Sequence, residues 1–403
     1  MGKATVGEAR TLSSLPIFGS KAALVIKDVL ILACAALAGI AIFYTLIAGF
    51  LVARFARQVP VTGVEPRPVT ILKPLHGAEP RLTDNLQTFL TQHWDAPIQL
   101  LCGVDSASDG ATASVEALRG NARAEISCVI DNSMHGSNGT VGNLINMMSE
   151  ARHDILILSD SDIAVAPDYL DQVVSALNEP GVGAVTCLYA GRGDAGFWSE
   201  LGAAGLSWQF LPNVVVSLAL KAGGVCMGST IALRRVTLDA IGGFARFADI
   251  LADDHAIGAA VREQGLDVVV PPMIVTHAST DRSLAELLRH ELRWAATVRQ
   301  VNPAGYAGMI VTHPLPFALA TLALAPRLGM LLLAGAIVAR LLLMENVQRL
   351  CSQSPASPWL LPLRDTLSFF VFLGGFVTGS VDWRGERLRM EHHGRISADA
   401  EKR

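Results

Sequence analysis

Charged residues are scarce in this chain, and neither sign dominates them. Only 17% of the 403 residues are Asp, Glu, Lys or Arg, and the formal net charge is −4. A protein that binds nucleic acid usually carries a strong basic excess. The composition therefore gives no indication of nucleic acid as a partner. Aromatic residues are also few, at 6%, and the chain has no internal repeat.

The cysteine spacing is not typical of a metal site. None of the six cysteines forms a C-x-x-C pair or another metal-ligand spacing. Several lie within apolar runs, which favours buried free thiols in a reducing compartment. They are Cys34, Cys102, Cys128, Cys187, Cys226 and Cys351.

A phosphate-binding loop is also missing. Residues 136–143 read GSNGTVGN, which is rich in glycine but lacks the lysine and the serine or threonine of a P-loop. A nucleoside diphosphate would therefore have to be held by a metal ion and by arginine.

Apolar residues, in contrast, are abundant and unevenly distributed. They make up 51% of the chain, and the mean hydropathy is +0.40. After an N-terminal tail at 1–27, residues 28–53 are apolar for long enough to predict a transmembrane helix. Arg54 and Arg57 follow it, which favours a cytoplasmic C-terminal side, but basic residues precede it as well.

The region 307–382 contains further membrane segments, and a basic tail at 383–403 predicts a cytoplasmic C-terminus. The apolar segments are 309–325, 328–344 and 360–381. Pro326 separates the first two and predicts a hairpin. Each of those two is short for a full span, so a re-entrant pair is an alternative and the number of crossings stays open.

Residues 66–282 are typical of one globular domain. Apolar runs such as VTIL, IQLLCGV and ISCVI alternate with helical patterns such as LTDNLQTFLTQ and TASVEALRG. That alternation indicates βαβ units, so we expect an α/β fold with a mostly parallel sheet.

An acidic pair follows an apolar run in the segment LILSDSDIAVAPDYL. The run at 155–158 predicts a buried strand, and Asp160 and Asp162 come directly after it. Ligands bind at the carboxyl ends of strands in open α/β sheets. A divalent cation would relieve the repulsion between the two carboxylates, and hard oxygen ligands suit Mg²⁺ or Mn²⁺. The alternative is a polar turn with an aspartate helix cap.

Two more acidic clusters accompany this pair. Asp105 and Asp109 follow the run IQLLCGV, so they are expected at the same sheet edge as the first pair. Asp253 and Asp254 open a helical pattern, where an aspartate is either a helix cap or a general base that the helix dipole keeps ionised.

The segment 283–306 predicts an amphipathic helix at the membrane interface. Leucines occupy one face of the pattern, whereas Arg293 belongs to the polar face and Trp294 to the border, as at a bilayer surface. A plain surface-anchor helix is the alternative. Arginine grips a diphosphate well through forked hydrogen bonds, which favours a binding role.

Taken together, these motifs resemble the ceramide glucosyltransferase-like family, and most closely its bacterial members of hopanoid biosynthesis. These are inverting transferases with a GT-A fold. The resemblance covers about 30–395, and nine landmarks follow one another in the family's order. They are VTILKPLHGAEPRLTDNLQTFL, CGVDSASDGA, GSNGTVGNLINMM, LILSDSDIAVAPDYL, VGAVTCLYAG, GSTIALRRVTLDAIGGF, LADDHAIGAAVREQG, HELRWA and VDWRGERLR.

The resemblance implies roles for the first two acidic clusters. Asp160 and Asp162 would hold Mg²⁺ or Mn²⁺ on the diphosphate of a UDP-sugar. Asp109, with Asp105 shortly before it, would orient the nucleotide. Lys73 matches a loop near the nucleotide.

The resemblance also implies a catalytic base and a closing motif. Asp254 matches the base, and Arg293 and Trp294 match the end of the family's (Q/R)-x-x-R-W motif. Two residues depart from the pattern. His290 stands where that motif has Gln or Arg, and Thr140 stands where relatives commonly carry a lysine.

The implied activity is transfer of N-acetylglucosamine or glucose from a UDP-sugar to a lipid hydroxyl. The segment TCLY at 186–189 resembles the bacterial branch, which predicts a hopanoid acceptor such as bacteriohopanetetrol, with ceramide as the alternative. We expect a protein of the bacterial inner membrane with its catalytic domain in the cytoplasm. A processive polysaccharide synthase would need more spans, and the acidic set argues against an inactive scaffold.

Overall fold

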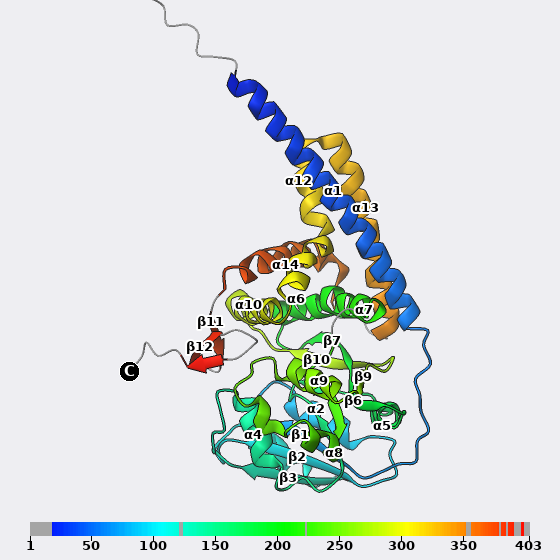
Figure 1. Cartoon of the computed structure of the whole chain (residues 1–403), viewed down its shortest axis with the longest axis vertical. Helices are drawn as coiled ribbons and strands as arrows, with labels where there is room; N and C mark the ends of the chain where they lie inside the picture. The colour runs from blue at the N-terminus through cyan, green and yellow to red at the C-terminus, as the bar shows by residue number, and fades with distance from the viewer. Residues whose placement is uncertain are drawn as a thin grey trace, which may run out of the picture.

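The computed structural model describes residues 18–120, 124–221, 224–351, 356–378, 380–383, 386–390 and 396–398. Three layers are visible (Figure 1). A sheet with its helices forms one end of the molecule, and the long helices α1 (Phe18–Phe55) and α13 (Pro326–Cys351) form the other. Shorter helices cross between these two parts.

The central sheet has seven strands in the order β3-β2-β1-β4-β8-β6-β9. Their bounds are β1 Val69–Pro74, β2 Ile98–Val104, β3 Glu125–Ile130, β4 Ile155–Leu158, β6 Val182–Thr186, β8 Ile231–Arg234 and β9 Asp267–Val269. The predicted mostly parallel α/β sheet is confirmed, with one difference. Strand β8 runs antiparallel to both of its neighbours, β4 and β6.

A second, smaller sheet lies between the central sheet and the membrane helices. Its order is β5-β10-β7, from Ile163–Ala164, Ile274–Ser279 and Leu188–Gly193. Strand β5 begins directly after Asp162, so the acidic pair occupies the passage from one sheet to the other.

Helices cover both faces of the central sheet in the globular part of the chain. They are α2 Leu82–Leu90, α3 Ala111–Leu118, α4 Gly139–Met147, α5 Tyr169–Leu177, α8 Arg235–Ala240, the 3-10 turn η2 Phe244–Phe247 and α9 Asp253–Glu263. The core is apolar and nearly closed to water: all residues of β1, β2 and β4 are buried. Burial on both faces explains why these strands read as continuous apolar runs.

The layer between sheet and membrane is built from helices that the sequence only partly predicts. These are α6 Phe197–Gly205, the π-helix η1 Leu206–Phe210, α7 Leu211–Ala219, α10 Leu284–Val301, α11 Pro303–Gly308, η3 Met309–Thr312, η4 Pro358–Leu360 and α14 Leu361–Gly375. Helix α10 is joined to α14 by a buried ion pair in which the Arg364 guanidinium lies 2.6 Å from Glu291 Oε1.

Three helices are long and apolar enough to cross a membrane within the described residues. They are Ala22–Phe55, Phe197–Ala219 and Pro326–Cys351. The second helix is largely buried inside the protein, since 61% of its most apolar stretch is enclosed, and the sequence alone did not reveal this. A further pair, Pro303–Thr312 and Pro314–Leu324, is bent by 56° and forms either a broken span or a re-entrant loop. The segment predicted at 360–381 is the short helix α14 and is not among these candidates.

Helix α12 (Pro314–Leu324) and helix α13 pack against each other as a tight hairpin. Ala325 alone separates them, and Pro326 begins α13, where a missing N–H costs no helical hydrogen bond. A side chain at Gly329 would collide with the backbone of Leu322, so the close approach requires glycine. Three short strands, β11 Ser380–Trp383, β12 Glu386–Met390 and β13 Ile396–Ala398, follow near the C-terminus.

Candidate active site

The acidic pair lies where β4 ends, beside the end of β1. Asp162 Oδ2 is 3.2 Å from His277 Nε2, and Asp162 Oδ1 is buried without a hydrogen-bond partner in the described residues. Asp160 is partly buried, and the loss of water around it raises its pKa well above the usual value, with the charges of Asp162 and Asp253 adding to the rise. The pair therefore forms a site that would gain from a cation.

Lys73, predicted to lie in a loop near the nucleotide, belongs to strand β1 and is enclosed at this edge. Its side chain is fully buried, and its ammonium donates to Ser159 Oγ at 3.0 Å and to the Asp160 carbonyl at 2.7 Å. The ammonium also lies 3.7 Å from the centre of the Phe89 ring. Burial lowers the pKa of Lys73 to about 7. Lys73 thus holds the backbone of the acidic turn in place.

Asp253 and Asp254 begin helix α9, as the sequence predicts, but neither acts as its N-cap. Asp254 Oδ2 accepts a hydrogen bond from Gly228 N at 3.1 Å, and Oδ1 accepts one from His255 N at 2.7 Å. Asp253 Oδ1 accepts from Asn138 Nδ2 at 3.2 Å. Burial raises the pKa of Asp254, which opposes the expectation that the helix dipole keeps it ionised.

The carboxylates of Asp160 and Asp254 both lie close to Gly228. A methyl group on Gly228 would lie 3.0 Å from Asp160 Oδ2 and 3.9 Å from Asp254 Oδ2. The two carboxylates, which are far apart in sequence, therefore approach the same glycine. Gly228 begins the motif GSTIALRRVTLDAIGGF, but it was not predicted as a site residue.

Asp109 and Asp105 follow β2 at the same edge of the sheet, as expected. Asp109 is nearly buried, and its carboxylate accepts hydrogen bonds from Gly77 N at 2.9 Å and Ala111 N at 2.8 Å. The hydrogen bonds that the Asp109 carboxylate accepts therefore mainly hold the loop after β1 and the start of α3. Asp105 is half-exposed, and His76 Nδ1 lies 4.0 Å from it.

Arg293 and Trp294 lie on helix α10 and turn toward the acidic edge. Burial lowers the pKa of Arg293, and the negative charges of Asp160 and Asp162 oppose that shift. The Trp294 ring lies 4.1 Å from that of His290 and 6.0 Å from that of His277. Trp294 therefore packs on two histidine rings next to the acidic edge.

The two departures from the family motif have structural partners. His290 Nδ1 lies 3.6 Å from Asp281 Oδ2, next to the Trp294 ring. The backbone N–H of Thr140 donates to Asn138 Oδ1 at 3.0 Å, as part of the cap that begins helix α4. Both positions thus have contacts inside the protein.

Two residues at the edge were missed by the sequence reading. His277 is a lone histidine in β10, and Tyr189 is a lone tyrosine in β7. Their rings stack with centroids 5.4 Å apart. A histidine and a tyrosine within two strands gave only a weak signal, because their spatial neighbours depend on the pairing of β7 with β10.

The acidic edge suits a hard divalent cation. The described residues contain no group of three or more His, Cys, Asp or Glu side chains that would hold a metal by themselves. Mg²⁺ and Mn²⁺ sites in phosphate chemistry commonly use one or two carboxylates and complete their ligands with phosphate oxygens and water. The unpartnered Asp162 Oδ1 and the adjacent Asp160 carboxylate fit that arrangement.

The sequence of this chain is similar to those of two ceramide glucosyltransferases. The chain is 23% identical to ceramide glucosyltransferase 1 of Caenorhabditis elegans over 83% of this chain and 74% of the relative. It is 22% identical to ceramide glucosyltransferase 3 of the same organism, over 56% of this chain and 49% of that relative.

The fold resembles that of a solved mannosyltransferase from Pyrobaculum calidifontis, determined in complex with GDP-Man and Mn²⁺. The two agree with a TM-score of 0.50 and 18% identity, over 86% of this chain and 98% of the other. The predicted GT-A fold is thereby confirmed. The family description "Glycosyl transferase family 21" matches residues 32–396, so the chain is a glycosyltransferase that belongs to glycosyl transferase family 21.

Proposed function

We propose that this glycosyltransferase moves a sugar from a UDP-sugar to the hydroxyl of a membrane lipid, with inversion at the anomeric carbon. The observation that carries the proposal is the approach of Asp160 and Asp254 to Gly228. A transfer in one displacement needs a donor-binding group and a base for the acceptor within reach of one reacting centre. These two carboxylates meet that requirement.

Asp254 acts as the base in this proposal. Its two backbone hydrogen bonds, from Gly228 and His255, fix the direction of the carboxylate. A pKa that burial raises above the usual aspartate value makes it a stronger proton acceptor for an alcohol. Asp254 would take the proton of the acceptor hydroxyl as the oxygen attacks the anomeric carbon.

Asp160 and Asp162 hold Mg²⁺ or Mn²⁺ in this proposal, and the cation would stabilise the charge on the UDP leaving group. Lys73 keeps the turn that carries Asp160 in position. Arg293 would bind the donor diphosphate, Trp294 would cover the site, and Asp105 and Asp109 would lie near the nucleotide. The Mn²⁺ bound to the solved mannosyltransferase supports a divalent cation here.

A lipid acceptor is supported by the candidate membrane-spanning helices on the side of the molecule next to the site. Strand β7 and helix α10 flank the acidic edge on the side of α6, α7 and α14 (Figure 1). We propose a bacterial inner-membrane enzyme whose catalytic domain faces the cytoplasm, where UDP-sugars are made. The preferred pair is UDP-N-acetylglucosamine with a hopanoid polyol such as bacteriohopanetetrol, on the basis of the TCLY segment at 186–189.

A second candidate has its own support. The matched relatives are named as ceramide glucosyltransferases, which favours glucose and ceramide. The experiment is a four-way assay of the purified protein in detergent with Mn²⁺: each donor, UDP-N-acetylglucosamine or UDP-glucose, with bacteriohopanetetrol or ceramide. Mass spectrometry identifies the glycolipid. Product with the hopanoid supports the first pair, product with ceramide alone supports the second, and no glycolipid in any arm contradicts both.

A further inference from the structure

A row of aromatic rings runs from the membrane-side helices to the acidic edge. Phe210, the last residue of the π-helix η1, stacks on Tyr189 with ring centroids 4.6 Å apart. Tyr189 stacks on His277 at 5.4 Å, and His277 meets Trp294 edge-on at 6.0 Å. A π-helix inside an otherwise regular helix frequently marks a functional site. The row places Tyr189 between a membrane-facing element and the carboxylates.

Strand β7 fixes Tyr189 beside the reacting groups. The chain just before it is tied to the segment that carries Gly228: Thr186 Oγ1 accepts from Met227 N at 2.9 Å, and Ser229 Oγ donates to the Cys187 carbonyl at 2.8 Å. Burial raises the pKa of Tyr189, and the charges of Asp254, Asp160 and Asp162 raise it further. The phenol is therefore protonated and able to donate a hydrogen bond.

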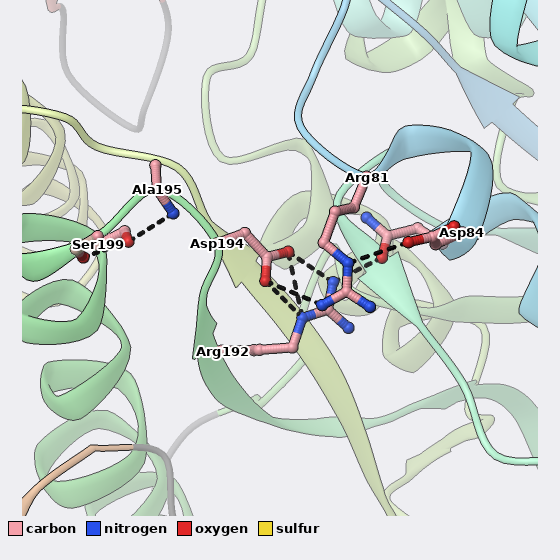
Figure 2. A network of polar contacts seen from close by, with 8 residues as sticks. Arg81, Asp84, Arg192, Asp194, Ala195 and Ser199 are labelled. Atoms are coloured by element: carbon pink, nitrogen blue, oxygen red, sulfur yellow. Dashed lines mark hydrogen bonds and ion pairs between the residues drawn. The ribbon is translucent and has the colours of Figure 1, made fainter.

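The far end of β7 is anchored as well, so the strand is a rigid support. The Arg192 guanidinium donates to the buried Asp194 carboxylate at 2.6 Å and to Asn85 at 2.8 Å (Figure 2). Arg81 also reaches Asp194, at 3.3 Å. These contacts join the end of β7 to helix α2 and its first turn.

The hydroxyl of Tyr189 differs from the other tyrosine hydroxyls of the chain. The sequence contains four tyrosines, and the other three each form a hydrogen bond. These bonds are Tyr44 to Asn213 at 2.8 Å, Tyr169 with Thr230 at 3.0 Å, and Tyr306 to the Phe372 carbonyl at 2.8 Å. Within the described residues Tyr189 has aromatic contacts but no hydrogen bond. Tyr189 is only half-buried, so its hydroxyl can reach a molecule bound at the acidic edge and donate a hydrogen bond to it.

We propose that Tyr189 is an acceptor-positioning residue: its hydroxyl donates a hydrogen bond to a second oxygen of the acceptor lipid, next to the hydroxyl that reacts. The reacting oxygen gives its proton to Asp254 and needs its lone pair for attack, so a donor is better directed to the neighbouring oxygen. The site then selects lipids with two adjacent oxygen functions, such as polyols, over simple alcohols. This inference rests on the proposed function and narrows its acceptor class.

The test compares Tyr189→Phe with wild type and with the control Tyr44→Phe. Phenylalanine keeps the stack on Phe210 and His277 and removes only the hydroxyl. Loss of one hydrogen bond should raise the acceptor KM about 10-fold, with whichever of bacteriohopanetetrol or ceramide the wild type glycosylates. The affinity for UDP with Mn²⁺ and the slow hydrolysis of donor by water should stay unchanged, since neither involves the acceptor.

A competition measurement checks the selected class. Dodecanediol with hydroxyls on adjacent carbons should inhibit wild-type transfer about 10-fold better than dodecanol, and Tyr189→Phe should abolish that preference. Transfer by Tyr189→Phe within about two-fold of Tyr44→Phe, or an equal loss of UDP binding, would overturn the role of Tyr189 while the proposed function stood. If wild type glycosylates neither lipid, the proposed function fails, and this inference fails with it.

Discussion

The backbone N–H of Gly228 donates a 3.1 Å hydrogen bond to Asp254, the residue proposed as the base. The same glycine faces Asp160, because any side chain there would meet Asp160 Oδ2 at 3.0 Å. One backbone position thus controls the separation of the two carboxylates on which the proposed transfer depends.

Replacing this glycine tests that relationship. Gly228→Ala should lower kcat/KM about 100-fold, since a misplacement of about 1 Å near a reacting centre can cost that much. The unfolding temperature should change little, because the added methyl group meets two polar side chains rather than the apolar core. Gly120→Ala, where no atom lies within 4 Å of the added methyl, is the matched control and should retain activity. Equal activities of the two variants would show that the carboxylates move apart freely.

The metal assignment has a binding measurement as well as an activity measurement. Asp160→Asn should remove nearly all transfer and also weaken UDP binding in the presence of Mn²⁺. Titration calorimetry should show that Mn²⁺ strengthens UDP binding to wild type but hardly at all to the variant. Full activity in EDTA would contradict a metal site at Asp160 and Asp162.

A second substitution distinguishes the role of the proposed base, Asp254, from that of the proposed metal ligand, Asp160. Asp254→Asn should bind UDP and Mn²⁺ with near wild-type affinity and yet lose about 10²–10⁴-fold in transfer rate, the usual effect of removing a general base. Asp253→Asn should be milder, because that carboxylate accepts from Asn138 and supports the start of α4 instead. Lost UDP binding in Asp254→Asn, or equal damage from both variants, would reassign the base.

The sequence predicted the parts of the site that are local in the chain. An apolar run followed by carboxylates is a buried strand that reaches a sheet edge, and this pattern placed Asp109 and Asp160 at the ends of β2 and β4 correctly. The head of α9 was also recognisable, since its helical periodicity begins at Asp253. Such features depend on neighbours within a few residues.

Other parts depend on contacts between distant segments and could not be predicted in this way. Lys73 resembles a surface residue in a loop, yet it lies at the end of a strand whose two neighbours enclose it. Trp294 has the position of an interface residue on α10, but it packs on His290 and toward His277. The π-helix at Leu206–Phe210 leaves no signal in hydrophobic periodicity.

The ion pair between α10 and α14 should contribute strongly to stability. In Glu291→Gln the buried Arg364 loses its charged partner, which typically costs about 3–5 kcal/mol for a buried pair. Thermal unfolding in detergent should show a clear drop in unfolding temperature, and transfer should fall because α10 carries Arg293. Glu345→Gln breaks the exposed pair with Arg349 and should change stability by about 1 kcal/mol or less. Similar unfolding temperatures for both variants would contradict the role given to this pair.

The central claim is transfer of a sugar to a lipid hydroxyl at the edge formed by Asp160, Asp162 and Asp254. The most direct measurement is mass spectrometry of lipid products from purified wild type and Asp254→Asn, each given UDP-N-acetylglucosamine, bacteriohopanetetrol and Mn²⁺, with the UDP-glucose and ceramide pair in parallel. We predict a glycosylated lipid that requires Mn²⁺ or Mg²⁺ and is nearly absent with Asp254→Asn. Formation of the same glycolipid by Asp254→Asn at the wild-type rate, or no glycolipid from wild type with either pair, would contradict the account.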